Sequence, residues 1–207
     1  MSVRVKICGI TRPEDSAYAA QCGADAIGIV FYPPSSRYVA DLALARDIAL
    51  AAGPFVNVVG LFVNADAKEV EDTIKTVPLS LMQFHGDESA EICERAQRPY
   101  IKALRMKEGL DLVAQCDLYT NASGFLLDTY VKGQPGGTGE RFDWQRVPQN
   151  TGRPLIVAGG LTPSNVSQAI AQTRPYAVDV SGGVESSPGI KSNEKVRAFI
   201  EKAKQKI

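Results

Sequence analysis

The feature that most constrains the fold of this 207-residue chain is an alternation of short apolar runs with helix-like segments, repeated about eight times. The runs are continuous apolar stretches rather than apolar/polar alternations, which is typical of strands covered on both faces. Strands that alternate with helices in this way predict an α/β protein with a parallel sheet. The predicted strands are residues 3–8, 26–31, 57–63, 81–85, 100–106, 124–130, 155–160 and 177–182.

Helix signals lie between these runs. Thr11, followed by Pro13, predicts an N-cap with proline in the first turn, and Thr162 with Pro163 predicts another helix start. The last helix carries a buried stripe of Val196, Phe199, Ile200 and Ala203, and the fifth and sixth helical segments are short and weakly periodic. Cys22, Cys93 and Cys116 fall in helical segments and are interpreted as packing residues.

Two architectures accommodate eight such units: a closed (β/α)8 TIM barrel and an open doubly wound sheet. The dinucleotide fingerprint G-x-G-x-x-G does not follow the first strand, and the sequence contains no Walker A motif. The count of eight favours the closed barrel. Without a linker or low-complexity segment, residues 1–207 are predicted to form one barrel domain.

Charge and composition limit the kinds of binding partner that the sequence predicts. Lys plus Arg and Asp plus Glu both number 23, so the formal net charge is zero and no global field attracts nucleic acid or an anionic membrane. No apolar run reaches about 18 residues, no signal segment is evident, and the four cysteines form no CxxC or Cys/His cluster. The chain is therefore predicted to be a cytoplasmic enzyme with reduced thiols and no metal.

Two ionisable residues stand where a barrel displays its chemistry. Cys8 ends the first predicted strand ahead of a glycine, and Asp128 ends the apolar part of the sixth. A proton acceptor and a proton donor at the carboxyl-terminal ends of strands are typical of acid–base catalysis in barrels. Because alternate residues of a strand share a face, Lys6 lies on the same face as Cys8 and is a candidate for the cation that its thiolate needs.

The seventh and eighth strands end in glycine pairs. In barrels the loops after these two strands commonly bind a substrate phosphate, and glycine lets backbone N–H groups approach the anion closely. The alternative is that these glycines only form turns. The predicted phosphate-binding residues are Gly159, Gly160, Ser181, Gly182 and Gly183.

Several motifs, in order along nearly the whole chain, resemble phosphoribosylanthranilate isomerase of tryptophan biosynthesis. The Lys-Ile-Cys-Gly-Ile-Thr and Gly-Gly-Thr-Gly stretches are the most specific of them. The matching segments are residues 5–11, 83–86, 127–128, 136–139, 158–161, 178–181 and 183–185.

The resemblance implies a (β/α)8 barrel that performs an Amadori rearrangement of a phosphorylated sugar substrate, N-(5-phosphoribosyl)anthranilate, without metal or cofactor. Cys8 is then the general base and Asp128 the general acid. Arg37 is implied to contact the anthranilate carboxylate, where a guanidinium can pair in bidentate fashion. His85 and Asp179 are substrate-binding candidates, although structural roles fit them equally well. A monomer or weak homodimer is expected.

The chain departs from the family pattern at two positions. This chain has Ser35-Ser36-Arg37 where the family usually has Ser-Pro-Arg, and Ser181-Gly182-Gly183 where it usually has Ser-Ser-Gly. The first keeps the arginine, and the second removes a hydroxyl near the predicted phosphate site.

Residues 133–139, which hold four glycines directly after Asp128, are predicted to be a lid.

Two other functions stay open at this point. The histidine-pathway aminoaldose isomerase family performs the same rearrangement, but its pattern has a pair of catalytic aspartates, one at each of two strand ends. Cys8 occupies the first of these positions and argues against membership of that family. A non-catalytic barrel that binds a phosphorylated ligand would show affinity without turnover. An assay with the anthranilate-bearing substrate separates these possibilities.

Overall fold

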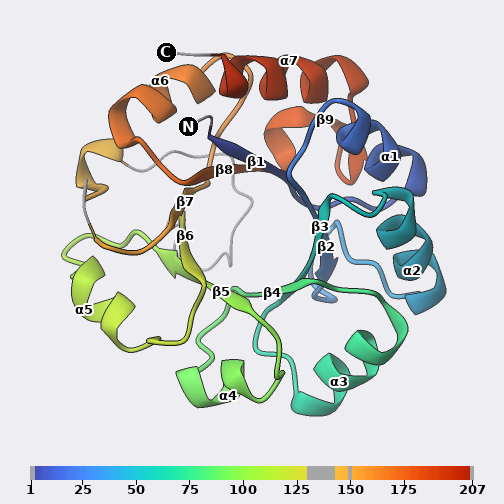
Figure 1. Cartoon of the computed structure of the whole chain (residues 1–207), viewed down its shortest axis with the longest axis horizontal. Helices are drawn as coiled ribbons and strands as arrows, with labels where there is room; N and C mark the ends of the chain where they lie inside the picture. The colour runs from blue at the N-terminus through green and yellow to red at the C-terminus, as the bar shows by residue number, and fades with distance from the viewer. Residues whose placement is uncertain (1–2, 130–142, 149–150, 206–207) are drawn as a thin grey trace.

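The computed structural model describes residues 3–129, 143–148 and 151–205. Eight parallel strands form a closed barrel in sequential order, with β8 pairing back to β1 (Figure 1). The predicted α/β barrel is therefore confirmed. The strands are β1 (Arg4–Ile7), β2 (Ala26–Phe31), β3 (Asn57–Phe62), β4 (Leu81–Phe84), β5 (Tyr100–Arg105), β6 (Gly124–Asp128), β7 (Leu155–Val157) and β8 (Ala177–Val180).

Helices surround the barrel (Figure 1). They are α1 (Pro13–Gln21), α2 (Leu42–Ala51), α3 (Ala67–Thr76), α4 (Ala90–Glu94), α5 (Leu112–Asp117), α6 (Val166–Thr173) and α7 (Asn193–Lys204). Between β6 and β7 the described residues hold one short 3-10 helix, η1 (Trp144–Arg146). After β8 come a second, η2 (Gly182–Val184), and a hairpin of β9 (Glu185–Ser187) and β10 (Ile190–Lys191). No helix in the described ranges is long and apolar enough to span a membrane.

The first predicted helix start is confirmed in part: α1 begins at Pro13 with acids in its first turn, but its N-cap is Arg12, which makes no capping side-chain hydrogen bond, rather than Thr11. The predicted start at Thr162 is wrong, because the N-cap of α6 is Asn165. The Thr11 hydroxyl instead donates to the carbonyl of Gly189 at 2.6 Å. A distant hairpin therefore takes the hydroxyl that the local pattern assigned to a cap.

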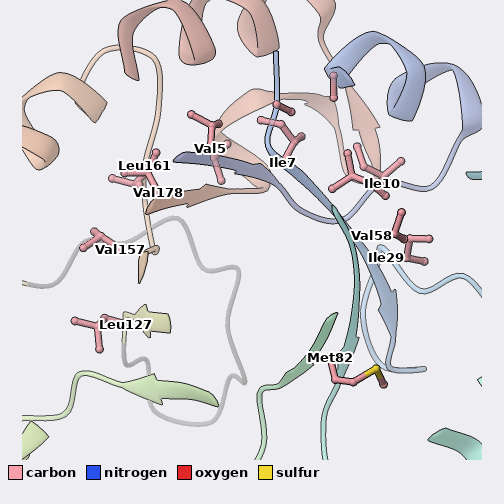
Figure 2. Close-up of a cluster of buried hydrophobic side chains, with 14 of the residues drawn as sticks. Val5, Ile7, Ile10, Ile29, Val58, Met82, Leu127, Val157, Leu161 and Val178 are labelled. Carbon is pink, nitrogen blue, oxygen red and sulfur yellow. The ribbon is translucent and has the colours of Figure 1, made fainter. Parts of the chain in front are cut away.

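The buried apolar side chains of the described residues form a large cluster outside the strands and smaller clusters inside the barrel. The larger cluster packs between the strands and the helices and includes Val5, Ile29 and Val178 (Figure 2). The stripe of Val196, Phe199, Ile200 and Ala203 on α7 is buried in this layer, as predicted. Cys93 and Cys116 are also buried there, and Cys22 packs against it. The barrel interior holds a second cluster, which includes Ile101, Leu126 and Ile156.

The mouth of the barrel is defined by the residues at which the strands end. Several observed strands end earlier than predicted. Cys8 lies one residue after β1, and His85 lies one residue after β4. Asp128 is the last residue of β6. Because all eight strands are parallel and the barrel is closed, these three side chains come to the same end of the molecule.

Candidate active site

A cavity of about 630 Å³ opens at this carboxyl-terminal end of the barrel. Hydrophobic walls come from Val30, Leu61 and Val63, and polar groups come from six of the eight strand ends or following loops. All ten predicted site residues line it: Cys8, Arg37, His85, Asp128, Gly159, Gly160, Asp179, Ser181, Gly182 and Gly183. Residues 133–139, the predicted lid, lie outside the described residues.

Lys6 and Asp179 form a buried ion pair beneath Cys8. The Lys6 Nζ donates to Asp179 Oδ1 at 2.9 Å, and neither side chain is more than 9% exposed. Burial alone would lower the pKa of Lys6, but Asp179 and Cys8 raise it above its usual range. Lys6 therefore carries a permanent positive charge under the thiol, on the face that strand alternation predicts.

Burial and neighbouring charges act in opposite directions on the pKa of the Cys8 thiol. Burial raises the pKa of the thiol, the Lys6 charge lowers it, and Asp179 raises it again. Burial prevails, so the pKa of Cys8 lies above its ordinary value.

Gly28 on β2 provides the space in which this pair sits. A Cβ atom at position 28 would lie 2.8 Å from Cys8 Sγ and 3.2 Å from Lys6 Cε. Any side chain there would displace the thiol, so Gly28 is a close-approach glycine.

Asp128 is held by hydrogen bonds on both oxygens. The Thr129 backbone N–H donates to Oδ1 at 2.8 Å, and His85 Nε2 lies 3.1 Å from Oδ2. His85 Nδ1 in turn lies 2.9 Å from Gln83 Nε2. With the Gln83 amide donating, the neutral imidazole carries its proton on Nε2 and donates it to Asp128.

Arg37 reaches the cavity wall from the loop after β2. Its backbone N–H donates to Ser35 Oγ at 3.1 Å, which stiffens the turn where the family usually has proline. Its guanidinium donates from Nε and Nη2 to the two carboxylate oxygens of Glu185, both at 2.7 Å. Lys191 Nζ also donates to Glu185, at 2.8 Å.

The glycine loops after β7 and β8 fold against one another. A Cβ at Gly183 would lie 1.9 Å from the carbonyl oxygen of Leu161, so Gly183 serves the contact between the two loops. Gly159 and Gly160 have φ angles of 78° and 61°, which glycine adopts readily. Ser181 Oγ is buried and has no hydrogen-bond partner among the described residues.

Sequence reasoning missed three residues of this region: Gln83, Gly28 and Glu185. Gln83 could have been found from strand alternation, which places it on the face of His85. The partner of Glu185 is 148 residues away, and no local pattern indicates that pairing. No group of three His, Cys, Asp or Glu side chains in the described part of the chain could hold a metal ion.

Known proteins are similar to this chain along nearly its whole length. A family described as N-(5'phosphoribosyl)anthranilate (PRA) isomerase matches residues 5–202. The N-(5'-phosphoribosyl)anthranilate isomerase of Pseudomonas fluorescens (strain Pf0-1) is 61% identical over 199 residues, which cover 96% of this chain and 97% of the relative. The same-named protein of Pseudomonas aeruginosa (strain UCBPP-PA14) is 60% identical over 200 residues, 97% of this chain and 94% of the relative.

Solved structures agree as well. The crystal structure of phosphoribosyl anthranilate isomerase from Thermotoga maritima is 40% identical, covers 98% of both chains and has a TM-score of 0.89. A phosphoribosyl anthranilate isomerase in complex with reduced 1-(o-carboxyphenylamino)-1-deoxyribulose 5-phosphate is also 40% identical over 98% of both chains, with a TM-score of 0.86.

A closed parallel barrel with ionisable side chains gathered at its carboxyl-terminal mouth defines the class of TIM-barrel enzymes. Within that class, the chain belongs to the N-(5'-phosphoribosyl)anthranilate isomerase family.

Proposed function

We propose that this chain converts N-(5-phosphoribosyl)anthranilate to 1-(2-carboxyphenylamino)-1-deoxyribulose 5-phosphate in tryptophan biosynthesis. The observation that carries the proposal is one cavity lined by a thiol, a carboxylic acid, an arginine and two glycine loops. These are the groups that an Amadori rearrangement of a phosphorylated, carboxylate-bearing aminoaldose requires. The family membership supports the same reaction.

The rearrangement divides into a ring opening, which needs an acid, and an enolisation, which needs a base. Asp128 protonates the furanose ring oxygen, the bond from that oxygen to C1 breaks, and the anthranilate nitrogen forms a Schiff base with C1. Cys8 as thiolate then removes the proton from C2, and the electron pair moves to the Schiff-base nitrogen. The resulting enol-amine becomes the aminoketose when C1 gains a proton and the C2 hydroxyl gives up its own, which leaves the C2 carbonyl.

The surroundings of the two residues suit these roles. Lys6 provides the cation that the thiolate needs, and Gly28 provides its space. His85 holds the Asp128 carboxyl in one orientation. Asp179 lines the cavity but pairs with Lys6, so we assign it first to that charge balance and only second to substrate contact.

The first test replaces the two proton-transfer groups. Cys8→Ser should lower turnover by about three orders of magnitude, and Asp128→Asn by two or more, the usual scale for one acid–base group. Both variants should still bind the reduced product analogue, because neither substitution changes the volume of the site. The readout is the loss of anthranilate-substrate fluorescence in a steady-state assay. Near-normal turnover in either variant would remove that residue from the mechanism.

The phosphate end needs a different test, because its glycines have more than one role. Substitution of Gly160 strains the backbone, and a Cβ at Gly182 would lie 3.2 Å from Arg37 Nη2. Ser181→Ala is cleaner, since Ser181 Oγ has no described partner to lose. We expect the KM for the phosphorylated substrate to rise about tenfold, as for a hydrogen bond to a charged group. A dephosphorylated analogue should bind Ser181→Ala and the parent equally weakly; equal losses would contradict a phosphate site here.

The remaining proposals concern the whole molecule. We propose one domain over residues 1–207, a cytoplasmic location, and a monomer or weak homodimer. One matching structure is described as monomers generated from the dimeric isomerase of Thermotoga maritima. Phe55, between α2 and β3, is 96% exposed and offers an apolar contact to a second copy. Sedimentation of the parent and of Phe55→Ser measures the state directly.

A further inference from the structure

Glu185 is a buried carboxylate that stands behind Arg37 rather than in the cavity. Its side chain is 6% exposed, and it is not among the residues that line the cavity, whereas Arg37 is. It begins β9, directly after η2. A buried carboxylate with this position can act on the site only through the groups it touches.

The contact between Glu185 and Arg37 occupies one particular edge of the guanidinium. Nε and Nη2 donate to the two carboxylate oxygens, both at 2.7 Å, in a bidentate pair. A guanidinium has a second bidentate edge, formed by Nη1 and Nη2. No described residue accepts a hydrogen bond from Nη1, so this second edge remains available for a carboxylate.

Charge makes the same arrangement favourable for an anion. Glu185 also accepts from Lys191 Nζ at 2.8 Å, so one carboxylate is shared by two cations. Arg37 and Lys191 thus place two basic side chains against one carboxylate. Burial alone would raise the pKa of Glu185, but the hydrogen bonds from Arg37 and the charge of Lys191 outweigh burial and lower it.

The hairpin that carries this cluster is fixed to the barrel at several points. Lys195 Nζ donates to the Glu185 carbonyl at 2.7 Å, and the Lys191 backbone N–H donates to Asp15 on α1 at 3.1 Å. Figure 1 shows β9 beside α1. Thr11 holds the hairpin turn through Gly189. Glu185 is therefore a fixed point against which Arg37 can be oriented.

We propose that Glu185 is a positioning residue: it holds Arg37 by the Nε/Nη2 edge so that the Nη1/Nη2 edge meets the ring carboxylate of the substrate. Glu185 thereby sets the preference for aminoaldoses whose aromatic ring carries a carboxylate next to the nitrogen. The inference rests on the proposed function, because it assumes that Arg37 binds this carboxylate.

The test compares two probes by calorimetry: the reduced 1-(2-carboxyphenylamino)-1-deoxyribulose 5-phosphate and the same compound without its ring carboxylate. Glu185→Gln should weaken binding of the first about tenfold and leave the second unchanged. In steady-state assays KM should rise about tenfold while kcat stays within about twofold. In an Arg37→Ala background, Glu185→Gln should cause no further loss, because the two residues act as one unit.

Glu88→Gln is the matched control, since Glu88 is also a buried carboxylate paired with a lysine but does not line the cavity. It should lower thermal stability without changing the ratio of the two affinities. Glu185→Asp keeps the charge beside Lys191 but shortens the reach to Arg37, and it decides the matter if Glu185→Gln does not fold.

The outcomes separate the two proposals. A parent protein that neither turns over the substrate nor prefers the carboxylate-bearing probe would overturn the proposed function. A parent that does both, with variants at Glu185 that keep the same preference or lose both probes equally, would overturn only the role of Glu185. A fall in kcat at constant KM would also overturn it.

Discussion

Among the buried lysine–carboxylate pairs of the described residues, two lie on opposite sides of the barrel's strand layer. Lys6 and Asp179 lie inside the barrel, and Lys102 on β5 and Glu88 lie outside it, with ion-pair distances of 2.9 Å and 3.0 Å. Ile101 and Ala103, the neighbours of Lys102, belong to the interior cluster, so Lys102 itself points toward the helices. Nearly the same pair of charges thus occurs once on each face of the strands.

The two pairs differ in how completely they are satisfied. Lys102 Nζ donates to Glu88 and to the carbonyls of Phe84 and Gly86, so all three of its N–H groups have acceptors. Glu88 also accepts from the backbone of Asn64 and Gly86. Lys6 has one carboxylate partner and otherwise acts on the Cys8 thiol. A saturated ion pair therefore fixes the fold, whereas an unsaturated one retains charge that can act on a reacting group.

The outer pair should respond in stability, and strongly. Lys102→Met should lower the free energy of unfolding by about 3–5 kcal/mol, because it leaves the Glu88 carboxylate buried without its partner. Urea unfolding measures this loss, and the pH profile of the remaining activity should be unchanged. As the control, Lys68→Met removes an exposed pair with Asp72 and should leave stability nearly unchanged, because solvent screens the two charges. A shifted pH profile in Lys102→Met would break the distinction between the pairs.

The inner pair should respond in activity. Lys6→Met removes the positive charge that lowers the pKa of Cys8, so burial and Asp179 raise it further. Turnover near neutral pH should fall about 10- to 100-fold, and the rising limb of the pH profile should move to higher pH, because a smaller fraction of the thiol is ionised. A turnover profile with the parent's midpoint would show that Lys6 serves the fold as Lys102 does.

A third prediction uses two strand glycines that face opposite layers. In Gly28→Ala the new Cβ would lie 2.8 Å from Cys8 Sγ, so turnover should fall about tenfold through displacement of the base, with KM nearly constant. In Gly60→Ala on β3 the new Cβ would lie 2.5 Å from Leu79 Cδ1, so stability should fall and turnover should not. Steady-state kinetics and thermal unfolding of both variants make the comparison. Equal kinetic losses would contradict it.

The fold could be predicted because each strand carries a continuous apolar run and each gap carries a helical pattern. The alternation of side chains also predicted that Lys6 and Cys8 share a face, which the structure confirms. The exact strand ends could not be predicted, because Cys8 and His85 continue the sequence pattern of the strands that they follow. Those residues leave the strand where the barrel opens.

Ten residues of the cavity could be predicted from the sequence, but the hydrogen bonds and ion pairs that hold them could not. All ten predicted site residues line the cavity, since each stands at a strand end or in the loop that follows, and all ends meet in a closed barrel. The Glu185 pair with Arg37 depends on how two loops 148 residues apart fold together. Neither composition nor periodicity carries that information, because a lone glutamate in a loop has many possible partners.

The thiols of the two layers should differ as the ion pairs do, though by less. Burial in the outer layer raises the pKa of Cys93 from 9.0 to about 12. Between these values the native state keeps a proton that the unfolded state loses, so stability falls as pH rises through this window, by at most about 1.4 kcal/mol per pH unit for one group. Cys93→Ala should make the decline in unfolding free energy between pH 9 and 11 shallower by about 1 kcal/mol per pH unit. Urea unfolding at several pH values checks the slope, which is independent of the packing lost with the side chain. An unchanged slope would mean that the Cys93 thiol titrates alike in both states, and that burial outside the barrel does not hold its proton.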